Sequence, residues 1–169
     1  MGSTIAFASV AITAALVLYT AGVFGERRHH YLGKAQLALF WAGLACDSTG
    51  TALMGSYART NGISDLGVHA VTGAVAIALM LAHAVWASLV VWRGSERARQ
   101  GFSRYSVAVW LAWLVPYLVG LLMGIPALGM TGTKAGVASV AIVAAIALVL
   151  RLRQEPTTHE DADGTRRQA

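Results

Sequence analysis

The sequence predicts an all-α integral membrane protein, a bundle of five transmembrane helices. Of its 169 residues, 56% are hydrophobic and only 12% are charged. Soluble domains carry roughly 25% charged residues, about twice this share. The charges gather in short stretches, and the apolar runs between them are long enough to cross the bilayer as helices of about 20 residues. Because lipid offers no hydrogen-bond partners, such runs satisfy their backbone polar groups as helices.

Gly, Ser and Thr recur in the five expected helices, as is typical where membrane helices pack closely. These helices cover residues 5–24, 35–54, 66–92, 105–123 and 133–150. We expect one transmembrane domain over residues 1–153. The polar tail over residues 154–169 contains no apolar run and is expected to be disordered.

The basic residues predict the orientation of the bundle. Eleven of the 13 Lys and Arg residues lie in the first loop, the third loop and the C-terminal tail, whereas Arg59 and Lys134 lie on the opposite side. The positive-inside rule then places the N-terminus outside and the tail in the cytoplasm. Residues 1–4 contain no basic side chain, unlike the start of a signal peptide, so we expect the first run to be retained.

The net charge of +5 does not indicate nucleic-acid binding. The basic residues collect at helix ends rather than on one continuous face, which is typical of contacts with anionic lipid headgroups. The single cysteine, Cys46, has no partner within the chain for a disulfide. The five tryptophans are expected mainly at the membrane interface and against lipid.

Two histidines in the third expected helix are the leading candidate ligands, because ionisable groups inside a membrane usually mark function. His69 and His83 are 14 residues apart, which places them within roughly 40° of each other on one helix face and about 21 Å apart along it. Gly73, Ala76 and Met80 lie between them on that face. A flat macrocycle can approach a helix backbone only where the side chains are mostly small, as on this face. Imidazole is the usual axial ligand of haem iron in bundles. We therefore expect these five residues to bind haem b, with the two histidines as iron ligands.

Asp47 is the acidic residue that lies well inside an expected span, within a polar run over residues 46–51. Its depth is closer to that of His69 than to that of His83. A hydrogen bond from His69 to Asp47 would orient the imidazole and raise its basicity, so Asp47 is a candidate member of the haem site. The alternative is a structural hydrogen bond to a neighbouring helix, with Gly43 and Gly50 permitting close approach. Both interpretations stay open at this point.

Simpler interpretations of the histidines also stay open. A single histidine in an apolar helix is often a hydrogen-bonded packing residue. His69 is about one turn from the outer end of its helix and can face headgroups and water, whereas His83 lies about ten residues from the inner end. His29 and His30 are expected to contact headgroups, with haem ligation near the inner leaflet as their alternative. A zinc site would have to gather Cys46, Asp47 and one histidine, and it ranks below haem.

Motifs spread over residues 15–125 carry a family resemblance. They are Tyr19-Thr20-Ala21-Gly22-Val23, Glu26-Arg27-Arg28, Phe40-Trp41, Cys46-Asp47-Ser48-Thr49-Gly50-Thr51, His69-Ala70-Val71-Thr72-Gly73, Met80-Leu81-Ala82-His83-Ala84-Val85-Trp86-Ala87, Phe102-Ser103-Arg104-Tyr105-Ser106, Val109-Trp110-Leu111 and Val115-Pro116-Tyr117. These stretches resemble the HsmA family of small bacterial membrane proteins, which is linked to haem sensing and haem tolerance. The resemblance implies a haem-binding protein of the bacterial inner membrane that takes up excess haem and protects the cell from its redox damage. It does not identify the iron ligands.

Three functional hypotheses follow. The favoured one is a haem-b-binding membrane protein that sequesters haem, rather than a metabolic enzyme. The second is a transmembrane b-type cytochrome that passes electrons to quinone, ferric iron or oxygen, which requires two haems per chain or a homodimer. The third is a proton-coupled transporter of small solutes that uses Asp47 and the histidines. The sequence contains no Gly-rich phosphate loop, no nucleophile motif and no lysine inside a span that would suit a retinal Schiff base.

Overall fold

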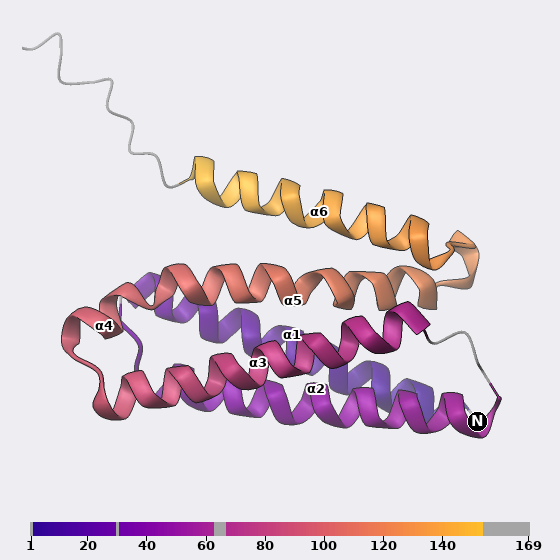
Figure 1. The fold of residues 1–169 in the computed structure, drawn as a ribbon, viewed down its shortest axis with the longest axis horizontal. Coiled ribbons are helices and arrows are strands. Elements are labelled where there is room, and N and C mark those ends of the chain that lie inside the picture. The colour runs from indigo at the N-terminus through magenta and orange to yellow at the C-terminus, as the bar shows by residue number, and fades with distance from the viewer. Residues whose placement is uncertain (1, 30, 63–66, 154–169) are drawn as a thin grey trace, which may run out of the picture.

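The computed structural model describes residues 2–29, 31–62 and 67–153, with the backbone alone for residues 2, 67–69 and 126 (Figure 1). The helices in chain order are α1 (Gly2–His29), α2 (Lys34–Thr60), α3 (Gly67–Arg93), α4 (Glu96–Gly101), α5 (Ser103–Gly124), the short 3-10 helix η1 (Pro126–Leu128) and α6 (Gly132–Leu152). Among the described residues, five helices are long and apolar enough to cross a membrane. The expected all-α fold with five apolar helices is confirmed to that extent. The expected disorder of the tail concerns residues outside the described part.

The helices extend beyond the apolar runs that predicted them. α1 continues from Phe24 through Glu26 to His29, because backbone hydrogen bonding does not stop where the apolar run ends. The short helix α4 was not expected. Its start follows a standard signal, since the Ser95 hydroxyl accepts a hydrogen bond from the Ala98 backbone N–H at 3.3 Å and Glu96 lies in the first turn.

Four helices form a ring in which each packs against two neighbours. α1 packs against α2 and α5, and α3 packs against the same two helices, so that α1 and α3 lie diagonally opposite. α6 lies against α5 on the outside of this ring (Figure 1). The interior of the bundle is therefore enclosed by α1, α2, α3 and α5, and any interior site must be built from their side chains.

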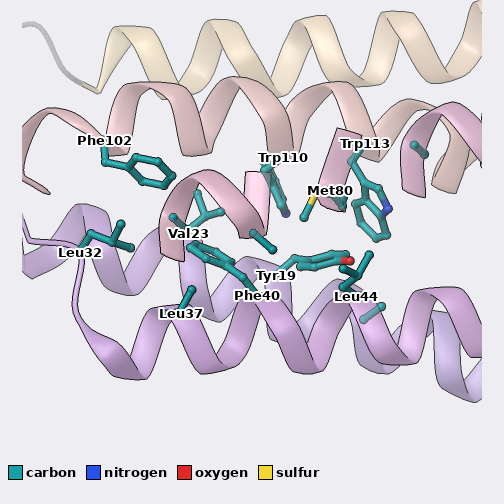
Figure 2. Close-up of a cluster of buried hydrophobic side chains, with 14 of the residues drawn as sticks. Tyr19, Val23, Leu32, Leu37, Phe40, Leu44, Met80, Phe102, Trp110 and Trp113 are labelled. Atoms are coloured by element: carbon teal, nitrogen blue, oxygen red, sulfur yellow. The ribbon is translucent and has the colours of Figure 1, made fainter. Parts of the chain in front are cut away.

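One face of each ring helix supplies the interior. On α1 the buried side chains follow helical spacing and are Ala8, Ala15, Tyr19, Val23 and Glu26. On α3 they are Ala76, Met80, His83, Ala84, Ala87, Ser88 and Val91. Large aromatic side chains from the other elements complete the core, as Figure 2 shows for Phe40, Phe102, Trp110 and Trp113. Inside a membrane this packing stabilises through van der Waals contact rather than through removal from water.

Two tryptophans depart from the expected lipid-facing position. Trp110 and Trp113 are only 7% and 2% exposed, whereas Trp86 and Trp92 are 60% and 73% exposed. The Trp110 indole N–H donates to the Thr20 hydroxyl at 3.2 Å, and the partly exposed Trp41 donates to the Ser88 hydroxyl at 3.1 Å. The expectation is wrong for Trp110 and Trp113 because an indole can pack its rings in the interior while its N–H bonds to a neighbouring helix.

The contact between α1 and α2 depends on two glycines. A Cβ on Gly43 of α2 would lie 2.5 Å from Cε1 of Tyr19, and a Cβ on Gly22 of α1 would lie 2.6 Å from Cε1 of Phe40. Each helix thus places an aromatic ring on a glycine of the other. Gly50 continues the contact, since a Cβ there would lie 3.0 Å from the Ala8 carbonyl oxygen. The close approach expected at Gly43 and Gly50 is confirmed.

Gly43→Ala should destabilise the bundle, because the added methyl group must displace the buried Tyr19 ring. We expect a loss of about 1–3 kcal/mol, the usual cost of overpacking a well-filled core, in reversible unfolding of the detergent-solubilised protein. Gly136→Ala in α6 is the matched control, because a Cβ there meets no atom within 4 Å. Equal stability of the two variants would contradict the proposed role of Gly43.

Candidate functional site

His83 lies on the buried face of α3 and is only 5% exposed. The Phe40 ring of α2 lies 4.8 Å from the imidazole, centroid to centroid, at an interplanar angle of 71°. The Phe102 ring, which precedes α5, lies 5.2 Å away at 33°. Among the described residues, no group hydrogen-bonds to Nε2 of His83. Buried polar atoms are nearly always paired, so this nitrogen, like Oε1 of Glu26 and the Tyr19 hydroxyl, is a buried polar atom that needs a partner.

Ala76 and Met80 share the buried face of α3 with His83 and are 7% and 1% exposed. Met80 lies between Trp110 and Trp113 in Figure 2. Gly73, nearer the start of α3, is partly exposed, and a Cβ there would meet no atom within 4 Å. The surface expected to receive a macrocycle is therefore filled by neighbouring side chains over Ala76 and Met80 and open at Gly73. A macrocycle bound at His83 must displace a ring that now lies against the imidazole.

The other expected ligand, His69, belongs to α3 by its backbone. Its side chain lies outside the described part of the structure, and so does its expected hydrogen bond to Asp47. Its role as a second iron ligand stays a prediction.

Asp47 bonds to a neighbouring helix. The carboxylate is 5% exposed, and its Oδ2 accepts the indole N–H of Trp113 on α5 at 2.8 Å. Trp113 packs edge-on against Tyr19 at 4.9 Å and stacks on Tyr117 at 5.5 Å. This contact corresponds to the structural alternative that the sequence left open for Asp47. Nearby, the fully buried Tyr19 hydroxyl is within electrostatic range of Asp47 and lacks a hydrogen-bond partner in the described chain.

Glu26 is a buried acidic residue that the sequence analysis missed. It is 0% exposed, and its Oε2 accepts a hydrogen bond from the Ser106 hydroxyl of α5 at 2.6 Å. Its Oε1 has no partner among the described residues. The apolar run ends at Phe24 and two arginines follow Glu26, so hydropathy alone places Glu26 outside the expected helix. The signal that reveals it is its spacing, since it follows Ala15 and Tyr19 by 11 and 7 residues and so lies on their face of the helix.

Arg99 of α4 was also missed. Its guanidinium donates hydrogen bonds to the Val91 carbonyl of α3 and to the Tyr31 hydroxyl, and its Nε donates to the Val90 carbonyl at 3.4 Å. It also lies over the Tyr31 ring at 5.5 Å. Arg99 thereby ties α4 both to the end of α3 and to the segment between α1 and α2.

In the part of the chain that the structure describes, no three His, Cys, Asp or Glu side chains come together as a metal site. Asp47 faces Trp113, and His83 faces two phenyl rings. The described residues therefore do not assemble the ligand set of a zinc site. A haem iron needs no such cluster, because the porphyrin supplies four ligands and the protein one or two.

Comparisons with protein-family models, with curated proteins and with solved structures found no match for this chain.

Ser106→Ala should destabilise the protein by about 1–3 kcal/mol, because it leaves the buried Glu26 carboxyl without its hydrogen-bond donor. The double variant Glu26→Met with Ser106→Ala should recover most of this loss in unfolding measurements, since both polar partners are then gone. Ser139→Ala is the control, because that buried hydroxyl donates to the Ala135 carbonyl of its own helix. A double variant less stable than Ser106→Ala would show that Glu26 contributes in another way.

Proposed function

We propose that this chain is a haem-b-binding membrane protein that sequesters haem and protects the cell against haem and oxidative stress, with His83 as an axial iron ligand. The observation that carries the proposal is the unpartnered Nε2 of a histidine buried inside a four-helix ring. A neutral imidazole nitrogen is a strong iron ligand, and bundle interiors are where such cofactors bind. The resemblance of residues 15–125 to the HsmA family supports the same function.

The residues around His83 suit a sequestering role. Once one of the two rings has moved off the imidazole, Phe40 and Phe102 would lie beside the porphyrin and exclude water from it, since both side chains belong to the buried core. Bound haem supplies iron-centred redox chemistry, and an apolar enclosure limits access of peroxide and water to the iron. Along the same face of α3, Ala76, Met80 and Gly73 are the residues that we propose to line the macrocycle.

His69 and Asp47 distinguish a sink from an electron relay. A relay across the membrane needs a second haem, for which His69 is the available ligand on α3, with Asp47 orienting it. A sink needs only the site at His83. A ratio of one haem iron per chain favours the sink, and a ratio of two favours the cytochrome.

We further propose that the protein spans the bacterial inner membrane five times, with the N-terminus outside and residues 154–169 in the cytoplasm. The support is the placement of 11 of 13 basic residues at one set of helix ends. The α4 end of the bundle is then the cytoplasmic end.

A green fluorescent protein fused after Ala169 should be fluorescent in bacterial cells, and alkaline phosphatase fused there should be inactive. Alkaline phosphatase fused after Gly62, between α2 and α3, should be active, because that segment is predicted to face outside. The reverse pattern of activities would overturn the proposed orientation.

His83→Ala should abolish most of the Soret absorbance that the purified full-length protein acquires on titration with hemin. The reason is that this substitution removes the nitrogen proposed to bind the iron. Optical titration, together with the iron-to-chain ratio, measures the effect. His29→Ala is the matched control, since His29 is an exposed histidine at the end of α1.

Equal hemin binding by wild type and His83→Ala would exclude His83 as the ligand. A wild-type protein that takes up no hemin at all would exclude the function. If His69→Ala removes one of two haems per chain, the cytochrome replaces the sink.

A further inference from the structure

The α4 end of the bundle is closed directly beside His83. Phe102, 2% exposed, connects α4 to α5 and places its ring against the imidazole. Leu32, fully buried, comes from the segment between α1 and α2 and belongs to the same core cluster. Figure 2 shows both side chains at this end of the core, beyond Phe40. Access to His83 from this end therefore depends on the segment that carries Phe102.

Apart from Phe102, that segment is weakly embedded. None of the six residues of α4 is buried, and the preceding Ser95 is exposed. Arg99 supplies hydrogen bonds from α4 to the Val90 and Val91 carbonyls and to the Tyr31 hydroxyl. A helix held largely by one polar side chain is the kind of element that opens locally at low free-energy cost.

Arg99 can leave its present hydrogen-bond acceptors at low cost. Val90 and Val91 lie in the last turn of α3, where carbonyls lack donors from their own helix. The Val90 carbonyl also accepts the Gly94 backbone N–H at 3.0 Å, so it keeps a partner when Arg99 leaves. All three acceptors of Arg99 are neutral oxygens. The guanidinium already makes these bonds charge-assisted, but a carboxylate would add an opposite charge and a bidentate match to its fork of donors, which neutral oxygens lack.

The position of Arg99 relates it to the His83 site. Val90 follows His83 by seven residues, which is nearly two turns and about 10.5 Å along the same side of α3. Arg99 bonds to Val90 and Val91, so it lies between His83 and the α4 end of the bundle, on the side of α3 that carries His83. Phe102 follows Arg99 by three residues, so a movement of α4 that frees Arg99 also moves the ring that covers the imidazole.

We propose that α4, together with Phe102, is a movable cover of the His83 site and that the hydrogen bonds of Arg99 hold this cover closed. A carboxylate-bearing macrocycle would draw Arg99 away from its present acceptors and then be bound by it. The nature of the ligand rests on the proposed function, whereas the cover rests on the contacts of Arg99 and Phe102. Haem fits this description, because its propionates are carboxylates at one edge of an otherwise apolar ring. Arg99 is then a positioning residue for the ligand and not a ligand of the iron.

The cover is tested without haem by chemical modification of His83. Diethyl pyrocarbonate carbethoxylates accessible imidazole nitrogens, and peptide mass spectrometry follows each histidine of the purified full-length protein. We expect Arg99→Ala to modify His83 about tenfold faster than wild type, because α4 opens more often. Arg99→Lys, which keeps the charge but not the fork of donors, should fall between them.

Two controls separate opening from unfolding. The exposed His29 should react at the same rate in every variant, and Arg97→Ala, which removes an exposed arginine from the same helix, should leave the His83 rate unchanged. Each variant should elute as a monodisperse species in size-exclusion chromatography. An unchanged His83 rate in folded Arg99→Ala overturns the proposal, as does an equal increase in Arg97→Ala.

The ligand is tested with hemin and with hemin dimethyl ester, whose carboxylates are masked. Wild type should bind hemin more tightly than the ester, and Arg99→Ala should lose most of this preference. A preference retained in full by Arg99→Ala overturns the carboxylate role of Arg99. Faster modification of His83 in a protein that binds neither compound supports the cover and contradicts the haem function, so the two failures are distinguishable.

Discussion

The reciprocal contact between α1 and α2 is the interaction on which the rest of the interior depends. Tyr19 of α1 lies on Gly43 of α2, and Phe40 of α2 lies on Gly22 of α1. A methyl group at either glycine would overlap the opposing ring, so the two helices approach this closely only with glycine at both positions. Tyr19 in turn supports Trp113, and Phe40 supports His83. The surroundings of Trp113 with Asp47 and the surroundings of His83 therefore both depend on the contact between α1 and α2.

Hydrogen bonds between side chains then connect the helices of the ring. Glu26 bonds to Ser106, Asp47 bonds to Trp113, and further indole N–H groups bond to hydroxyls of α1 and α3. In an apolar medium such bonds are individually modest, at about 0.6 kcal/mol on average in one well-measured membrane protein, but they are directional. They select one rotation of each helix, which van der Waals packing of small residues would leave less defined.

Nε2 of His83 lacks a hydrogen-bond partner among the described residues, as Oε1 of Glu26 does, but the imidazole is packed between aromatic rings and its nitrogen can ligate iron. Aromatic rings contact the imidazole from α2 and from the start of α5, and the latter is joined to a short surface helix held by Arg99. The buried imidazole nitrogen, its apolar enclosure and the proposed cover would together form a site that admits a large apolar ligand and then excludes water from it. The sequestration that we propose needs each of these properties.

The sequence by itself determined the number and position of the long helices, because twenty-residue apolar runs leave the backbone no other way to satisfy its hydrogen bonds in lipid. Helical spacing also identified the face of α3 that holds Ala76, Met80 and His83, since periodicity is a local property. Only the tertiary structure decided what meets that face. Asp47 pairs with Trp113 from 66 positions away, and Glu26 with Ser106 from 80 away. The helix Glu96–Gly101 acquires its role through an arginine that bonds to other elements. Which side chains form hydrogen bonds between helices depends on which helices become neighbours. The pattern within one apolar run does not specify the helix that packs against it.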